Sequence, residues 1–381
     1  KRMMADVPLG AFLSGGIDSS TVVALMKAAN SGPVKTFSIG FEQAAFNEAP
    51  HAAAIARHLG TDHTELTVTA REALDVVPKL ADMFDEPFAD SSQIPTYLVS
   101  AMTRKHVTVA LSGDGGDELF AGYNRYQLTS RSWQALSLMP EFARNGVAAA
   151  LTSQPTERWD RLSKVLPRSL TPPQLGDKIH KVASVLKLRD ADALYRRLVS
   201  HWEPTALMAG TEETRGILWD ESVRKDFPDL LDRMQFLDLV TYLPDDILTK
   251  VDRCSMAIAL EARVPLLDHR VVELAWRLPH SVKIRGGVTK WLLRQVLYRH
   301  VPRALVERPK MGFGVPLAEW LRGPLRDWAE NLLSEQRLAE TGLFDVALVR
   351  RYWHDHLSGA RNWQYLLWDL LMFESWRERW G

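Results

Sequence analysis

The chain has 381 residues, of which 46% are hydrophobic and 25% charged, which is the balance of an ordinary globular protein with room for one large domain or two smaller ones. Its 47 Lys and Arg residues cancel its 47 Asp and Glu residues, so the overall charge gives no reason to expect nucleic acid or a membrane surface as a partner. No apolar stretch approaches the roughly 20 residues that cross a bilayer. The single cysteine, Cys254, excludes an intrachain disulfide and fits a cytoplasmic protein.

The start of the chain is unusual for a native terminus. It opens with Lys1 rather than Met, and an apolar strand pattern begins within a few residues. Because native termini usually fray, we expect this sequence to belong to a longer chain.

Strand and helix patterns alternate along the first part of the chain, up to about residue 130. Alternation of this kind indicates a parallel sheet with helices on both faces, and ligands of such sheets bind beyond the carboxyl ends of the strands. The expected strands are 7–13, 34–41, 63–69 and 107–111, and the expected helices are 19–29, 47–59 (closed by Gly60), 71–83 and 94–105.

Strand signals fade after this point, and helical spacing dominates to the end of the chain. The clearest helical segments are 191–201, 230–243, 271–277, 290–300 and 363–380. We therefore predict one domain over 1–381, with an α/β core at 1–130 and a helical part at 131–381 packed on that core. Most of the 13 tryptophans lie at helical spacing beside Leu and Met, which favours core packing over a carbohydrate site.

The first glycine-rich break is Leu13-Ser14-Gly15-Gly16-Ile17-Asp18-Ser19-Ser20, between an expected strand and an expected helix. Backbone N–H groups at a helix N-terminus favour an anion, and glycines let the backbone approach a phosphate closely. Asp18 would repel a phosphate unless it holds a bridging Mg²⁺. The lysine of a G-x-x-x-x-G-K-[ST] loop is missing here. The alternative is an ordinary glycine-rich turn with a capping serine.

The second break, Ser112-Gly113-Asp114-Gly115-Gly116-Asp117-Glu118, follows the fourth expected strand. It places carboxylates at the same sheet edge as Asp18, and carboxylates from two strand ends are natural Mg²⁺ ligands. The alternative is a solvated acidic turn.

The first break resembles the loop of the PP-loop ATP pyrophosphatases, a superfamily that also includes argininosuccinate synthetases, GMP synthetases and tRNA thiolases. The second break resembles a signature of the glutamine-hydrolysing asparagine synthetase family, in its C-terminal synthetase domain. So do three further segments, at 243–248 with 250–253, at 261–268, and at 308–314 (Arg-Pro-Lys-Met-Gly-Phe-Gly). The resemblance runs from about Met4 to Trp320, with the motifs in the family's order.

The resemblance implies a nucleotide site with specific residues. Ser14, Gly15, Gly16, Ser19 and Ser20 would bind phosphates, Asp18 and Asp117 would hold Mg²⁺, the backbone of Phe12, Leu13 and Ile39 would contact adenine, and Ser112 with Gly113 would contact the ribose and the α-phosphate region.

The resemblance also implies three residues that act on the reacting groups. Asp114 stands at the position of an acidic residue that handles the acyl-adenylate and the ammonia, although the best-known members carry Glu there. Arg253 stands where a basic residue is expected near the phosphates; its alternative is a surface salt bridge. Lys310 matches the catalytic lysine, which would neutralise charge developing on the phosphates. Lys290, on an expected helix, should matter far less.

The implied reaction is ATP plus aspartate plus ammonia giving asparagine, AMP and pyrophosphate. In the family the ammonia comes from glutamine through an N-terminal glutaminase domain, which these residues do not contain; a homodimer is also compatible with the family. The rivals are a related enzyme that closes a β-lactam or lasso-peptide ring, a tRNA-thiolating enzyme, and a non-catalytic nucleotide-binding regulatory module. One cysteine and zero net charge argue against tRNA thiolation.

Overall fold

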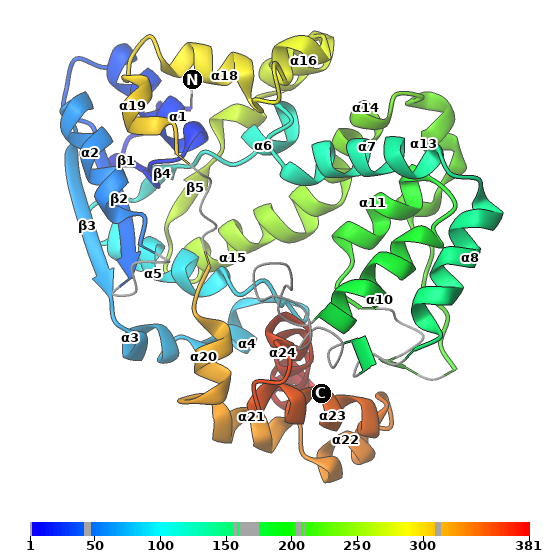
Figure 1. Cartoon of the computed structure of the whole chain (residues 1–381). Helices are drawn as coiled ribbons and strands as arrows, with labels where there is room; N and C mark the ends of the chain where they lie inside the picture. Colours follow the sequence, from blue (N-terminus) through cyan, green and yellow to red (C-terminus); the bar gives the residue numbers. More distant parts are fainter. Residues whose placement is uncertain are drawn as a thin grey trace. The chain divides into compact units, whose positions relative to one another are not determined.

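The computed structural model describes residues 2–41, 47–154, 158–159, 175–202, 207–208, 210–308 and 314–381. The chain divides into two compact units: the first is Lys1–Gly122 with Gln235–Gly381, and the second is Tyr123–Met234 (Figure 1). Within the described residues, no helix is both long enough and apolar enough to span a membrane.

A five-stranded sheet, parallel throughout, organises the first unit. Its order is β3-β2-β1-β4-β5, so β1 lies at the centre and the chain runs outward on both sides of it. The strands are β1 (Leu9–Phe12), β2 (Lys35–Phe41), β3 (Asp62–Val68), β4 (Val109–Leu111) and β5 (Glu261–Arg263). Because all strands are parallel, their carboxyl ends and the loops that follow meet at one edge.

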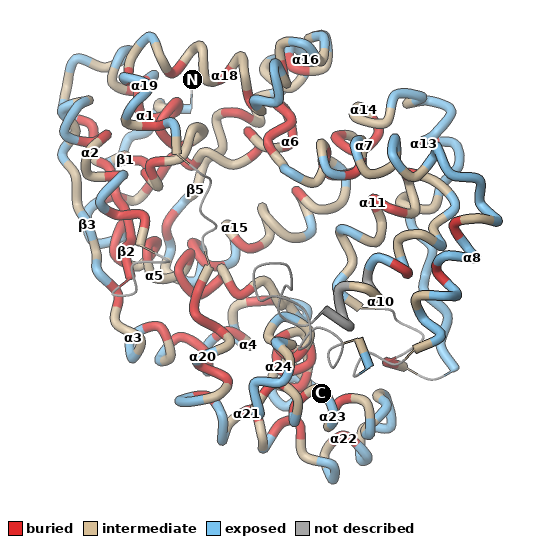
Figure 2. The backbone as a smooth tube through the Cα atoms, viewed as in Figure 1, coloured by how far each residue is buried: buried red, intermediate tan, exposed pale blue. Residues whose placement is uncertain are grey.

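Helices cover both faces of this sheet. On one face lie α1 (Ile17–Ala29), α2 (Ala49–Leu59), α18 (Trp291–Leu297) and α19 (Arg303–Val306), and on the other lie α5 (Gln93–Arg104) and α15 (Thr249–Met256). Alternate residues of the strands, among them Ala11, Leu13 and Leu111, form a buried core with α1 and α2. Figure 2 shows this burial along β1, β2 and α1, whereas the edge strand β3 is largely accessible.

The remaining helices of the first unit lie between or after the strands in the chain. Several of them form a helical cluster, in which α24 packs on α4, α20, α21 and α23. Trp320, Trp353 and Trp368 are buried in this cluster, in line with the predicted core packing. These helices are α3 (Ala70–Leu74), η2 (Val77–Lys79), α4 (Leu80–Met83), α6 (Gly116–Leu119), the π-helix η4 (Leu243–Leu248), η5 (Pro265–Leu267), α16 (His269–Arg277), α17 (His280–Lys283), α20 (Leu317–Arg322), α21 (Arg326–Leu332), α22 (Glu335–Thr341), α23 (Val346–Leu357) and α24 (Gln364–Trp380).

The described part of the second unit is helical. In it α7 packs on α11 and α8 packs on α10. Its elements are α7 (Asn124–Ser137), α8 (Glu141–Thr152), α10 (Leu175–Leu186), α11 (Ala191–Val199), η3 (Ile217–Trp219) and α13 (Glu221–Asp226), and α14 (Leu230–Val240) begins in this unit and continues into the first.

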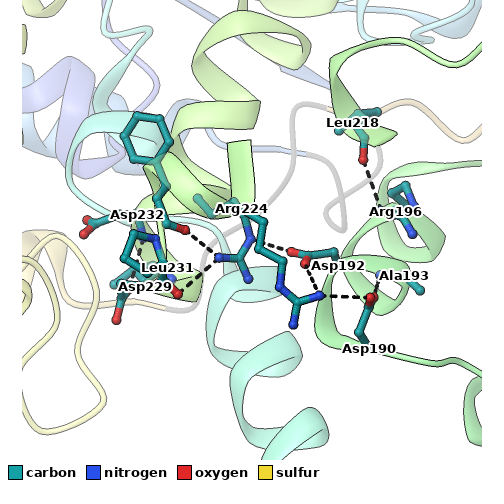
Figure 3. A network of polar contacts seen from close by, with 12 residues as sticks. Asp190, Asp192, Ala193, Arg196, Leu218, Arg224, Asp229, Leu231 and Asp232 are labelled. Atoms are coloured by element: carbon teal, nitrogen blue, oxygen red, sulfur yellow. Dashed lines mark hydrogen bonds and ion pairs between the residues drawn. The ribbon is translucent and has the colours of Figure 1, made fainter. Parts of the chain in front are cut away.

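A polar network joins three of these helices (Figure 3). Arg224 of α13 pairs with Asp190 at 3.3 Å and with Asp192 at 3.8 Å, and Arg233 of α14 pairs with Asp192 at 2.6 Å. Asp190 also caps α11, because its side chain accepts a hydrogen bond from the Ala193 nitrogen at 2.8 Å. These contacts stabilise the helical unit.

The predicted α/β class is confirmed, and most predicted elements lie within a few residues of the observed ones. Gly60 ends α2 in the left-handed conformation with φ of 61°. Two expectations were wrong. The single helix expected over 71–83 is divided into α3, η2 and α4, and the fifth strand lies in a segment where no strand was expected.

Candidate functional site

The loop between β1 and α1 is held in a tight, self-bonded conformation. The Ser14 and Ser19 hydroxyl oxygens lie 2.9 Å apart, and the Ser19 hydroxyl also accepts a hydrogen bond from the Ser14 nitrogen at 3.2 Å. Gly15 has φ of +75°, and a Cβ there would meet the backbone of His51 and Ala52 at 3.0–3.1 Å. The glycine is therefore required by both conformation and space.

The predicted adenine and phosphate residues around this loop belong to the sheet and to α1. The nitrogen of Leu13 donates to the Phe37 carbonyl at 2.8 Å, which continues the β1–β2 pairing beyond Phe12. Ile39 lies within β2, paired with Leu66. Gly16 directly precedes α1, and Ser20 is fully buried in its first turns.

The loop after β4 packs directly on the first loop. A Cβ on Gly113 would lie 2.6 Å from the Ser19 nitrogen, and a Cβ on Gly116 would lie 2.4 Å from Asp18 Oδ1. The Ser112 nitrogen donates to the Arg263 carbonyl at 2.8 Å, which ties the loop to β5. The two glycine-rich breaks predicted to share a sheet edge are thus in contact.

Asp18 and Asp117 converge on one side chain, that of Lys290. The Lys290 ammonium donates to Asp18 Oδ2 and lies 2.8 Å from Asp117 Oδ1. Burial lowers the pKa of Lys290, but the charges of Asp18 and Asp117 outweigh this effect and raise the pKa above its ordinary value. Lys290 is therefore a buried cation in contact with both predicted metal ligands, while the expectation that it matters far less than Lys310 concerns activity and stays a prediction.

The two carboxylates suit the predicted Mg²⁺ chemically. They are hard oxygen donors from two different loops, and the shared ammonium shows that their oxygens can approach a single cation.

Asp114 lies beside this pair in a desolvated environment. Burial raises the pKa of Asp114, while a hydrogen bond of 2.7 Å from the Ser112 hydroxyl and the charge of Lys250 act in the opposite direction. Its carboxyl group consequently holds a proton more readily than an ordinary aspartate.

Lys250 on α15 forms a buried ion pair that the sequence did not reveal. Its ammonium donates to Asp90 and lies 3.8 Å from Asp246. Although burial opposes its charge, the attraction of Asp90 and Asp246 raises the pKa of Lys250 to about 12. The positive charge of Lys250, which lies on a helix of the other face of the sheet, thus acts to lower the pKa of Asp114.

Arg253, on the same helix, has a side chain that is 43% exposed. It pairs with Asp85 at 2.7 Å and with Asp252 at 3.0 Å, so the geometry matches the alternative of a surface salt bridge. Neither contact joins it to the two glycine-rich loops.

Lys310 lies outside the described residues, which stop at Arg308 and resume at Gly314. Arg308 itself reaches the first loop: its Nη2 donates to the Ser14 carbonyl at 3.3 Å and to Glu48 at 2.9 Å. Arg308 is thus the last described residue before this gap, and it contacts the Ser14 loop.

The fold and the site define a class of protein, a parallel α/β protein whose two glycine-rich loops are in contact at the carboxyl edge of the sheet, with acidic residues beside them. The chain belongs to the asparagine synthase family, whose model matches residues 1–378. Members of this family are ATP-using ligases that form carbon–nitrogen bonds.

Individual relatives agree with the family assignment. Asparagine synthetase [glutamine-hydrolyzing] 1 of Bacillus subtilis is 34% identical over 378 residues, which cover 98% of this chain and 56% of the relative. A putative asparagine synthetase [glutamine-hydrolyzing] of Mycobacterium bovis is 37% identical over 99% of this chain and 55% of its own length. Amidase chyE of Penicillium rubens is 26% identical over 90% of this chain and 54% of its own length. The chain spans about half the length of the curated relatives it matches.

Proposed function

We propose that the chain is the synthetase part of an enzyme that converts aspartate to asparagine with ATP. The observation that carries the proposal is the contact between the two glycine-rich loops, which brings Asp18 and Asp117 together on Lys290 at the carboxyl edge of the sheet. Membership of the asparagine synthase family supports the choice of reaction.

Activation of the carboxylate is the first step of the proposed reaction. An oxygen of the aspartate β-carboxylate attacks the α-phosphorus of ATP, the bond between the α-phosphorus and the bridging oxygen breaks, and pyrophosphate leaves with the electron pair. The Ser14–Ser20 loop would hold the phosphates, and Lys310 would neutralise charge that develops during this step. Asp18 and Asp117 would hold Mg²⁺, which when bound offsets the phosphate charge.

Amide formation is the second step. The ammonia nitrogen attacks the acyl carbon of the aspartyl-adenylate, AMP leaves as the acyl–oxygen bond breaks, and one proton of the nitrogen must be removed. Asp114 would accept that proton, because its raised pKa makes it a stronger base than an ordinary carboxylate. Arg253 remains a second proposed cation near the phosphates, although its described ion pairs are with Asp85 and Asp252.

The ammonia would be supplied by a glutaminase. The relatives are named as glutamine-hydrolysing, and this chain matches only about half of their length, so a glutaminase domain is the proposed partner of this unit. We also propose the cytoplasm as its location, and a homodimer stays a prediction about assembly.

A second candidate is the amidation of a different carboxylate. It is favoured by the amidase-named relatives and by Asp114, whose side chain is one methylene shorter than the glutamate expected at that position.

One experiment separates the two. Release of AMP and pyrophosphate is measured with ammonium across a panel of amino-acid and peptide carboxylates. We expect aspartate to give the highest kcat/KM and equimolar asparagine and AMP. Preference for another acceptor would establish the second candidate, and release of neither product with any acceptor would contradict both.

A further inference from the structure

Lys290 is placed where a metal ion is proposed to bind. Its ammonium contacts one oxygen of Asp18 and one of Asp117, and its side chain is only 7% exposed, against 18% for each carboxylate. An ordinary surface lysine keeps its strongly hydrated ammonium in water and is not enclosed in this way.

The backbone around Lys290 is built to hold it there. The residue has φ of 53°, a left-handed conformation that is unfavourable for a residue with a side chain. Its nitrogen donates to the Phe120 carbonyl at 3.1 Å, which fixes it to the end of α6. Gly122 completes the enclosure, since a Cβ there would lie 2.0 Å from Lys290 Cε and 2.2 Å from Asp117 Oδ1. The position of the ammonium is thus fixed by the strained backbone of Lys290, by its hydrogen bond to Phe120 and by the absence of a side chain at Gly122.

The charges explain what this position does. Asp18 and Asp117 would repel each other if nothing lay between them, and the ammonium removes that repulsion. A divalent cation that used the same carboxylates would have to displace the ammonium or accept its repulsion at short range. Lys290 therefore stabilises the carboxylate pair without metal and, by the same contacts, opposes the metal.

We infer that Lys290 is a positioning residue that acts as a built-in counter-ion for the carboxylate pair, so that a divalent ion binds the pair only in competition with it. This inference rests on the proposed function, because the metal ligands are those proposed above. The phosphates of a nucleotide supply negative charge both to the Lys290 ammonium and to the divalent ion. Metal and nucleotide therefore bind cooperatively, and each raises the affinity for the other.

The test uses Mn²⁺, whose free concentration is read by electron paramagnetic resonance, with the wild-type chain and the variant Lys290→Met. Methionine keeps much of the side-chain length and removes the charge. We expect Lys290→Met to bind Mn²⁺ about tenfold more tightly without nucleotide, and a non-hydrolysable ATP analogue to enhance Mn²⁺ binding less than in the wild type. Lys290→Arg should keep the wild-type Mn²⁺ affinity, because the charge remains.

Two controls locate the effect. Lys283 is also buried, with its ammonium 3.1 Å from the Gln235 side-chain oxygen, so Lys283→Met removes a buried lysine charge elsewhere and should leave Mn²⁺ affinity unchanged. Adding Asp117→Asn to Lys290→Met should abolish the gain, because it removes a ligand.

Unchanged or weaker Mn²⁺ binding by folded Lys290→Met would overturn the inference. If this variant is folded but less stable than the wild type without metal, Mn²⁺ should raise its melting temperature more than it raises that of the wild type, and an equal or smaller rise would overturn the inference as well. Failure of the proposed function would be seen separately, as absence of ATP–pyrophosphate exchange in the wild type.

Discussion

Gly113 lies so close to the first turn of α1 that a Cβ on it would come within 2.6 Å of the Ser19 nitrogen. The backbone nitrogens at the start of α1 are those proposed to face the phosphates, and Gly113 fixes the second loop against them. Any side chain at position 113 must push the two loops apart.

Gly113→Ala should therefore impair the site. We expect about 1–3 kcal/mol of lost stability from the forced backbone shift, and a loss of roughly 100-fold in ATP–pyrophosphate exchange from the misplaced loops. Thermal unfolding and isotope exchange measure the two effects. Gly146 is the matched control: it lies inside α8, and a Cβ added to it would meet nothing within 4 Å apart from the nearby backbone of its own helix, so Gly146→Ala should stabilise the chain by up to about 1 kcal/mol.

The Arg308–Glu48 pair should contribute measurable stability. Its side chains are 16% and 10% exposed, so removing one partner leaves a poorly solvated charge. Arg308→Gln should lower the free energy of unfolding, measured by urea titration, by about 3 kcal/mol. Adding Glu48→Gln to this variant should lower it little further. The more exposed Arg337–Glu378 pair, at 3.1 Å, is the control, and Arg337→Gln should cost less than about 1 kcal/mol. Equal costs at the two arginines would refute the prediction.

Lys310 should matter in the transition state more than in the ground state. Lys310→Ala should lower the adenylation rate by ~10²–10³, the effect of losing one charge-stabilising donor, while ATP affinity changes little. Lys310→Arg should recover part of the rate. Single-turnover kinetics and equilibrium ATP binding separate these quantities, with exposed Lys105 at the end of α5 as the control. Weak ATP binding with an intact rate would instead make Lys310 a ground-state phosphate contact.

This chain should form amide from ammonium without hydrolysing glutamine. Cys254 is buried, its thiol donates to the Gln93 carbonyl at 3.4 Å, and burial raises its pKa to about 12, so it supplies no thiolate nucleophile. Glutamate release from glutamine should stay at background, and Cys254→Ala should leave ammonium-dependent amide formation intact. Glutamate release that disappears in Cys254→Ala would show that the thiol is reactive after all.

His356 should make stability depend on pH. Burial and the charge of Arg322 lower its pKa to about 4, and its Nδ1 accepts a hydrogen bond from the Trp363 nitrogen at 3.2 Å. Because the folded pKa is below the unfolded one, this contribution is fully present above pH 6.5 and is lost as the pH falls toward 4, by up to about 3 kcal/mol. His356→Asn keeps an acceptor but does not titrate, so the difference in unfolding free energy between wild type and variant should shrink as the pH falls. A constant difference between pH 7.5 and 4.5 would contradict this prediction.

Features encoded in contiguous residues were predictable from sequence. The alternation of strand and helix indicated the parallel sheet, and the Ser14–Ser20 and Ser112–Asp117 segments carry their glycines, hydroxyls and carboxylates side by side, so their shared edge followed from topology alone.

Features that depend on distant contacts were not predictable in this way. The strand β5 is only three residues long and is defined by pairing with β4 rather than by a pattern of its own. Lys290 was interpreted as an ordinary helix lysine, because its partners Asp18 and Asp117 are far away in sequence. One local signal was present: a lysine at the start of a helix opposes the helix dipole, which suggests a nearby anion.

The pairing of Leu111 with Arg263 joins sheet neighbours that the whole second unit separates in the chain. Closing so large a loop costs entropy before the contact forms, so we expect this edge of the sheet to pair late in folding. During synthesis the ribosome also releases Asp18 and Asp117 long before Lys290, so a growing chain carries the two acids without their lysine. The site is therefore completed late in synthesis. A chain truncated before α18 would contain Asp18 and Asp117 without the ammonium of Lys290 that pairs with them.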